Sequence, residues 1–252
     1  PFFFWREFRR MVKSVNPQAY LVGEVWREAG PWIRGDIFDG VTNYRLRELL
    51  LDYISTRVLD GEDFGFELQT LLASHGCAAA NMLNLLDSHD TSRILTTLKG
   101  DIDLLRIALT AQMTLPGAPM VYYGDEVGLL GETDPDCRRC FPWDHNKWSQ
   151  AVYSTTQALI ALRKKHPALR EAQPASLAFF NGVYAYKMEA VKDEVIIVLN
   201  PREAIANLAI PTASEITTWV EAFSGVVFPV NDGNITIDPV PAKSALVFIP
   251  KE

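Results

Sequence analysis

The segment MLNLLDSHD at residues 82–90 is a short apolar run that ends in a cluster of polar and charged side chains. A run of this kind predicts a buried strand, and the polar cluster predicts a site at the carboxyl end of that strand. Three further segments predict short strands, at residues 20–22, 38–44 and 120–123. The polar residues that follow the strands are Glu24, His89, Asp90, Asp125 and Glu126.

Amphipathic helices are predicted around these strands, because apolar residues recur there every three to four positions. The predicted helices span residues 3–13, 44–59, 64–74, 102–114 and 150–165. Short strands that alternate with helices indicate a parallel sheet covered by helices, and hence an α/β fold. Only four strand–helix units are visible, whereas a closed (β/α)8 barrel needs eight.

The pattern changes after residue 166, where short alternating runs separated by turn residues replace the helices. These runs lie at residues 183–188, 194–199, 217–220, 234–237 and 245–249. They predict a small antiparallel all-β domain. We therefore expect two domains, at residues 1–166 and 167–252.

The composition excludes several classes of protein. The chain has 252 residues, of which 48% are hydrophobic and 22% charged, so it can bury a core and is not disordered. A net charge of −7 disfavours nucleic-acid binding but does not penalise a neutral substrate such as a sugar. No apolar run is long enough to span a membrane. No signal peptide is recognisable after Pro1, and the opening segment is typical of the inside of a longer chain.

Three cysteines do not make a disulfide framework. Cys137 and Cys140 form a lone CRRC, which we interpret as two incidental thiols because a closed zinc site needs four ligands. We expect no metal and no cofactor, since too few oxygen ligands gather for calcium. Free thiols favour a cytoplasmic location.

Glu24 and Trp26 form the first candidate site. A carboxylate at a strand end beside an aromatic ring suits a general acid, because an apolar wall raises its pKa. A helix-capping or surface glutamate is the alternative interpretation.

His89, Asp90 and Arg93 form the second candidate site. His89 and Asp90 could bind hydroxyl groups or a metal, and Arg93 could hold a carboxylate in place. A serine–histidine–aspartate relay is excluded at residues 88–90, because adjacent residues of an extended strand point to opposite faces. The alternative is a polar loop with a capping aspartate.

The loop at residues 134–144 contains acid–base pairs and aromatic rings, which suit a carbohydrate-binding rim. Asp134 and Arg138 are its candidate binding residues. An ordered loop with internal salt bridges explains the same composition.

Taken together, four motifs give the chain a clear resemblance to the α-amylase family, glycoside hydrolase family thirteen. The motifs are LVGEVW at 21–26, NLLDSHDTSR at 84–93, GAPMVYYGDEVGL at 117–129 and TDPDCRRCFPWD at 133–144. The chain looks most similar to the branch of cyclomaltodextrinase, neopullulanase and maltogenic amylase. The resemblance implies the C-terminal half of a (β/α)8 TIM barrel, followed by a β-sandwich domain.

The resemblance also implies roles for single residues. Glu24 matches the catalytic acid/base, and Asp90 matches the carboxylate that stabilises the transition state. His89 matches a sugar-binding histidine, and Trp26 would flank the leaving-group side. Asp134 and Arg138 match a pair that holds glucose units on the non-reducing side.

The nucleophilic aspartate of the family has no counterpart, because its G-x-R-x-D motif is absent from this sequence. Asp36, Asp39 and Asp87 do not lie in its context. We therefore expect a fragment of a retaining glycosidase that cleaves α-1,4-glucosidic bonds, inactive by itself. Its expected partners are an α-glucan or maltooligosaccharide and the missing half of the barrel, or a second copy of the chain. A transglycosylase, a trehalose-forming isomerase and a non-catalytic carbohydrate-binding module remain alternatives.

Overall fold

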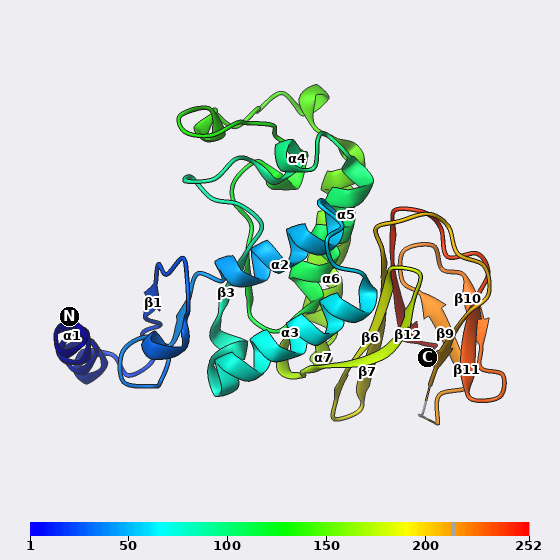
Figure 1. Cartoon of the computed structure of the whole chain (residues 1–252), viewed down its shortest axis with the longest axis horizontal. Helices are drawn as coiled ribbons and strands as arrows, with labels where there is room; N and C mark the ends of the chain where they lie inside the picture. The colour runs from blue at the N-terminus through cyan, green and yellow to red at the C-terminus, as the bar shows by residue number, and fades with distance from the viewer. Residues whose placement is uncertain (213–214, 252) are drawn as a thin grey trace.

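The computed structural model describes residues 1–212 and 215–251 (Figure 1). Four short parallel strands run through its first part: β1 (Val22–Gly23), β2 (Gly40–Val41), β3 (Leu83–Leu85) and β4 (Ala118–Met120). β1 pairs with β2 and β3 pairs with β4, and a parallel bridge from Thr42 to Leu83 joins the two pairs. The strands therefore lie side by side in chain order, and their carboxyl ends share one edge.

Helices surround these strands. They are α1 (Phe2–Val15), α2 (Tyr44–Ile54), α3 (Gly61–His75), α4 (Ile94–Thr97), α5 (Ile102–Thr114), α6 (Gln150–Lys165) and α7 (Ala168–Glu171). Short 3-10 turns complete this part: η1 (Gly30–Trp32), η2 (Gly76–Asn81), η3 (Asp125–Val127), η4 (Asp136–Arg138) and η5 (His145–Lys147). Side chains cap four of the longer helices at their first turn and satisfy amides that have no partner inside the helix. The capping residues are Asn43, Asp60, Asp101 and Ser149.

Several element boundaries predicted from the sequence differ from those of the structure, and two of these differences are informative. The helix predicted over 44–59 ends at Ile54, because the chain leaves the helix and reaches a left-handed conformation at Arg57, with φ 57°. The strand predicted over 120–123 is instead β4 at 118–120. The two tyrosines that follow β4 belong to the loop and pack on the buried guanidinium of Arg93.

The C-terminal part consists of antiparallel strands. They are β5 (Pro174–Phe180), β6 (Val183–Ala190), β7 (Asp193–Asn200), β8 (Leu208–Pro211), β9 (Thr218–Glu221), β10 (Val227–Pro229), β11 (Asn234–Ile237) and β12 (Ser244–Pro250). Six of them form one sheet in the order β10-β9-β12-β7-β6-β5, and β8 pairs with β11. Apolar side chains from both sheets, including Ile196, Ile210 and Ile235, form one buried cluster between them.

The six-stranded sheet is buried on both faces along β6 and β7. Alternate side chains of β6, Tyr184 and Tyr186, join the helices in one core with Phe64 and Leu105. The intervening Ala185 joins the cluster shared with β8 and β11. The helical and sheet-rich parts therefore share a continuous core, and Figure 1 shows α2, α3, α5 and α6 in the middle of the molecule.

The N-terminal helix α1 is less buried than the helices that form the shared core. None of the residues of α1 is buried, and its aromatic side chains pack on the chain at Phe2–Trp32 and Trp5–Phe38, with ring centroids 4.8 and 5.3 Å apart. Arg9 and Lys13 also pair with Asp39, at 2.9 and 3.0 Å. In Figure 1, α1 and β1 lie at the opposite end of the molecule from the antiparallel strands.

Candidate functional site

Glu24 follows β1 directly, and its side chain is exposed at the carboxyl end of that strand. The amide of Val25 donates to the hydroxyl of Thr42 at 3.1 Å, which fixes the chain just beyond the strand. A groove of about 430 Å³ reaches Glu24 and is lined mostly by apolar and aromatic side chains, among them Trp5, Trp32 and Phe38. Glu24 thus lies at the edge of an apolar and aromatic groove at the carboxyl end of β1.

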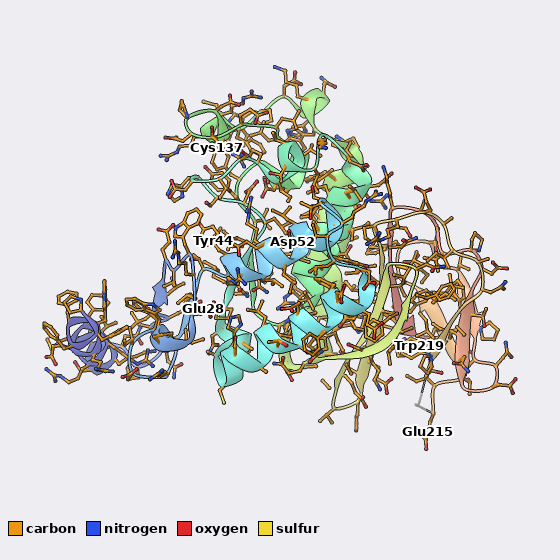
Figure 2. All side chains as sticks on the ribbon, viewed as in Figure 1. Glu28, Tyr44, Asp52, Cys137, Glu215 and Trp219 are labelled. Atoms are coloured by element: carbon orange, nitrogen blue, oxygen red, sulfur yellow. The ribbon has the colours of Figure 1, made fainter. Side chains whose placement is uncertain are left out.

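Trp26 stacks on Tyr44, the first residue of α2, with ring centroids 3.8 Å apart and an interplanar angle of 11°. The Trp26 side chain is 45% exposed, whereas Tyr44 is 3% exposed. The Tyr44 hydroxyl lies 3.1 Å from the hydroxyl of Ser88, which follows β3 closely. The sequence analysis missed Tyr44; its only signal was an aromatic residue at the junction of a predicted strand and helix. Figure 2 shows Tyr44 at the N-terminal end of α2.

The pKa of the Tyr44 hydroxyl responds to both candidate carboxylates. Burial raises the pKa of Tyr44, the hydrogen bond with Ser88 lowers it, and the negative charges of Glu24 and Asp90 raise it further. A charge acts appreciably on a neighbour only at short range in water. Glu24, from the end of β1, and Asp90, from the loop after β3, therefore both lie within electrostatic range of the same tyrosine.

Asp90 lies at the centre of a set of polar contacts. Its Oδ1 atom lies 3.3 Å from His89 Nε2 and 3.2 Å from Arg138 Nη2. Arg138 Nε lies 2.8 Å from Asp134 Oδ1 and donates to the carbonyl of His89 at 3.1 Å. The four side chains are 40–57% exposed, so these pairs add little stability but leave polar atoms open to a ligand.

Arg93 does not lie on this surface. Its side chain is completely buried, Nε donates to the carbonyl of Cys137 at 2.7 Å and Nη1 donates to that of Tyr123 at 2.5 Å. It does hold a carboxylate, since Nη1 lies 3.4 Å from Asp125 Oδ1. Arg93 was grouped with the candidate substrate-binding residues His89 and Asp90, but its burial leaves the guanidinium no access to a ligand.

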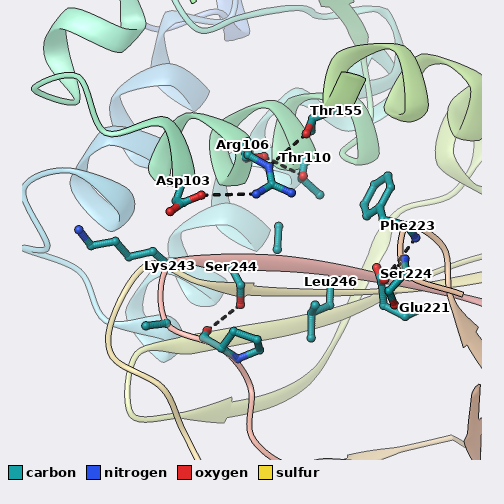
Figure 3. Close-up of a pocket in the computed structure, with 13 residues that line it drawn as sticks. Asp103, Arg106, Thr110, Thr155, Glu221, Phe223, Ser224, Lys243, Ser244 and Leu246 are labelled. Carbon is teal, nitrogen blue, oxygen red and sulfur yellow. Dashed lines mark hydrogen bonds and ion pairs between the residues drawn. The ribbon is translucent and has the colours of Figure 1, made fainter. Parts of the chain in front are cut away.

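Three other features were considered: metal sites, membrane-spanning helices and a second pocket. Within residues 1–212 and 215–251, no group of three His, Cys, Asp or Glu side chains is placed to hold a metal ion. In the same ranges no helix is long and apolar enough to cross a membrane. Figure 3 shows a pocket of about 390 Å³ between α5 and the β12 region, lined by residues that include Arg106, Phe223 and Lys243. None of the site residues predicted from the sequence lines it, and its charged groups pair with neighbouring side chains or backbone amides.

Comparison with known proteins gives the same assignment for most of the chain. The family described as the alpha amylase catalytic domain matches residues 2–173. A cyclomaltodextrinase from a Bacillus species is 43% identical over 204 residues, which are 80% of this chain and 37% of that protein. Neopullulanase 2 from Thermoactinomyces vulgaris is 38% identical over 227 residues, which are 88% of this chain and 39% of that protein.

A solved structure titled cyclomaltodextrinase superimposes with a TM-score of 0.92 at 37% identity, covering 98% of this chain and 43% of that chain. The chain spans about two fifths of the length of the curated relatives it matches. The fold and these similarities agree with the resemblance drawn from the motifs: the chain belongs to the α-amylase family.

Proposed function

We propose that the chain supplies the acid/base and the transition-state-stabilising carboxylate of a retaining glycosidase. Its substrates are the α-1,4-glucosidic bonds of cyclodextrins, pullulan, starch or maltooligosaccharides. The observation that carries the proposal is that Glu24 and Asp90 follow two strands of one parallel sheet, β1 and β3, and that both lie within electrostatic range of Tyr44. The names of the relatives, cyclomaltodextrinase and neopullulanase, support the substrate class.

Each side chain of the site has a task in this reaction. Glu24 protonates the glycosidic oxygen as the bond to the leaving sugar breaks, and its carboxylate then deprotonates the incoming water. Asp90 carries a negative charge that stabilises the oxocarbenium-like transition state. His89 and the Asp134–Arg138 pair offer donors and acceptors to sugar hydroxyls, and the exposed face of Trp26 offers a stacking surface to a sugar ring.

A second reacting carboxylate is needed, because a retaining glycosidase forms a covalent intermediate on a carboxylate about 5 Å from the acid/base. The nucleophile motif of the family is absent from this sequence. We propose that the nucleophile comes from outside the chain and that the chain does not turn over substrate alone.

The arrangement of the strands supports an architecture in which residues 1–166 form half of a (β/α)8 barrel and residues 167–252 form a β-sandwich. Among the described residues, β1 pairs only with β2 and β4 pairs only with β3, so each has an open edge. Strands of a complementary half would complete the sheet at these edges. A second copy of the chain is the other candidate for that position.

A chimera tests the catalytic assignment. Residues 1–252 would replace the matching segment of the Bacillus cyclomaltodextrinase, whose remaining sequence then supplies the rest of the barrel. We expect the chimera to hydrolyse β-cyclodextrin. Glu24→Gln should lower kcat by about 10²–10⁴-fold, because it removes the proton donor. Asp90→Asn should lower kcat by about 10²–10³-fold, because it removes the stabilising charge.

Glu28→Gln is the matched control, since Glu28 is an exposed glutamate four residues from Glu24. It should leave kcat unchanged, and circular dichroism must show that all variants are folded. A folded chimera in which Glu24→Gln hydrolyses β-cyclodextrin at the parent rate would refute the acid/base role. Turnover by the isolated 252-residue chain, abolished by Glu24→Gln, would refute the proposal that the nucleophile lies elsewhere.

A further inference from the structure

Asp87 and Asp125 form a buried pair of carboxyl groups that none of the roles above uses. Their side chains are 0% and 3% exposed and act on each other at close range, and Asp87 Oδ1 is buried with no hydrogen-bond partner among the described residues. We propose that the two groups share one proton, and that this pair positions the loop that carries His89 and Asp90. The catalytic role of that loop rests on the proposed function, whereas the inference of a shared proton is independent of it.

A hydrogen bond between the carboxyl groups of Asp87 and Asp125 requires a proton on one of them. An ionised carboxylate only accepts hydrogen bonds, so two carboxyl groups bond to each other only when one of them is protonated. Asp87 Oδ2 accepts from the amide of Ile94 at 2.6 Å, while Asp87 Oδ1 is buried and receives no N–H or hydroxyl donor within the described residues. Without a proton, two negative charges would face each other away from water, which is strongly unfavourable.

The charges around the pair also favour a single proton. Arg93 Nη1 lies 3.4 Å from Asp125 Oδ1 and is the one cation that forms an ion pair with either group within the described residues. Arg47 of α2 acts on Asp87 from a greater distance and donates to the carbonyl of Leu86 at 2.7 Å. One proton leaves the two carboxyl groups with a single negative charge, which the fully buried guanidinium of Arg93 neutralises.

The same contacts hold the loop at both ends. Asp87 caps the first turn of α4 through the amide of Ile94, and the amide of Arg93 donates to the carbonyl of Gly131 at 2.9 Å. The Arg93 side chain reaches the loop after β4, where the thiol of Cys137 donates to the carbonyl of His89 at 3.2 Å. The segment between the two anchors contains His89 and Asp90.

The pair has a defined effect on stability. Burial raises the pKa of Asp125 well above its ordinary value and raises that of Asp87 in the same direction. In the unfolded chain both groups lose their protons at the ordinary aspartate pKa, so between that pH and the folded pKa the native state binds more protons. The stabilisation is therefore complete below the ordinary pKa and is lost as the pH rises through the folded pKa. The unfolding equilibrium constant rises by up to about tenfold per pH unit in that window.

Carboxyl-carbon NMR of the aspartate-labelled 252-residue chain tests the shared proton, and urea unfolding at a series of pH values tests the linkage. Asp87→Asn and Asp125→Asn each replace the proton with an amide that donates in its place, so both variants should fold. Asp232→Asn is the control, because Asp232 lies exposed in a turn at φ 49°, which asparagine tolerates. Hydrogen exchange of the amides of residues 88–92 tests the loop, with Asp87→Ala and Asp125→Ala as variants that cannot donate.

We expect one aspartate of the parent chain to keep its proton well above the ordinary pKa. The retained proton and the rise of the unfolding equilibrium constant with pH should both vanish in Asp87→Asn and Asp125→Asn. Both should persist in Asp232→Asn. The Ala variants should lose protection at residues 88–92, and the Asn variants should restore it. If every aspartate titrates in the ordinary range, the shared proton is refuted. If the proton is present but the Ala variants keep parental protection, the positioning role is refuted. Neither readout depends on hydrolysis of a glucan.

Discussion

Gly40 of β2 offers a sharp test of how the strands of the site fit together. An added Cβ would lie 1.9 Å from the carbonyl oxygen of Asn81 and 2.9 Å from the hydroxyl of Tyr20. That hydroxyl donates to the same carbonyl at 2.6 Å. Gly40→Ala must therefore push β2 away from the end of η2 and disturb this hydrogen bond. Because Gly40 pairs with Val22 of β1, the shift would propagate to the strand that carries Glu24.

The cost can be worked from these contacts. Overpacking costs about 1–3 kcal/mol, and loss of the hydrogen bond costs about 1 kcal/mol. The lower entropy of the unfolded alanine chain returns about 0.4–1 kcal/mol. We expect Gly40→Ala to lower the free energy of unfolding by about 2–3 kcal/mol, measured by urea unfolding followed by circular dichroism. Gly30→Ala is the control, because its added Cβ would meet no atom within 4 Å. A Gly40→Ala chain as stable as the Gly30→Ala chain would refute the reasoning.

Three other substitutions test the packing and the electrostatics. Tyr53→Phe should cost about 1–2 kcal/mol in urea unfolding, because the buried hydroxyl bonds the carbonyls of Gly182 and Leu199 at 2.9 and 2.8 Å; an unchanged midpoint would contradict this. Trp26→Ala should cost about 0.5–1.5 kcal/mol through loss of the stack on Tyr44, with Trp26→Phe recovering part of it. Burial lowers the pKa of His75, so stability present above the ordinary histidine pKa is lost as the pH falls through the folded pKa. His75→Gln should remove that acid dependence, and an identical pH profile would count against it.

Periodicity and strand-end chemistry predicted much of the fold and part of the site. The helices at 102–114 and 150–165 have the bounds expected from their apolar spacing, because capping residues mark their starts. Glu24, His89, Asp90, Asp134 and Arg138 are exposed, and their binding and catalytic roles remain predictions. Arg93 could not be separated from them by sequence, since nothing in its local pattern shows that a loop from the end of β4 covers it.

The contacts of Tyr44 and of the Asp87–Asp125 pair were not predicted from the sequence, for a related reason. Each depends on segments that are distant in the chain: Tyr44 meets Ser88 across 44 positions, and Asp87 meets Asp125 across the β3–β4 connection. Local patterns describe which face of an element is apolar, but they carry no information on which polar group will meet which. Buried polar contacts between elements are therefore the part of a site that a single sequence reveals least.

The surrounding structure holds Asp90 more firmly than Glu24. Asp90 lies on a loop anchored by the buried side chains of Asp87 and Arg93, within the part of the chain that shares its core with the C-terminal sheet. Glu24 follows β1, whose cluster with Ile37, Phe38 and Met82 is small and whose flanking helix α1 buries none of its residues. A catalytic pair needs a distance fixed to a fraction of an ångström. The position of Glu24 thus depends on what covers the open edge of β1, so that completing the sheet would also set the geometry of the proposed acid.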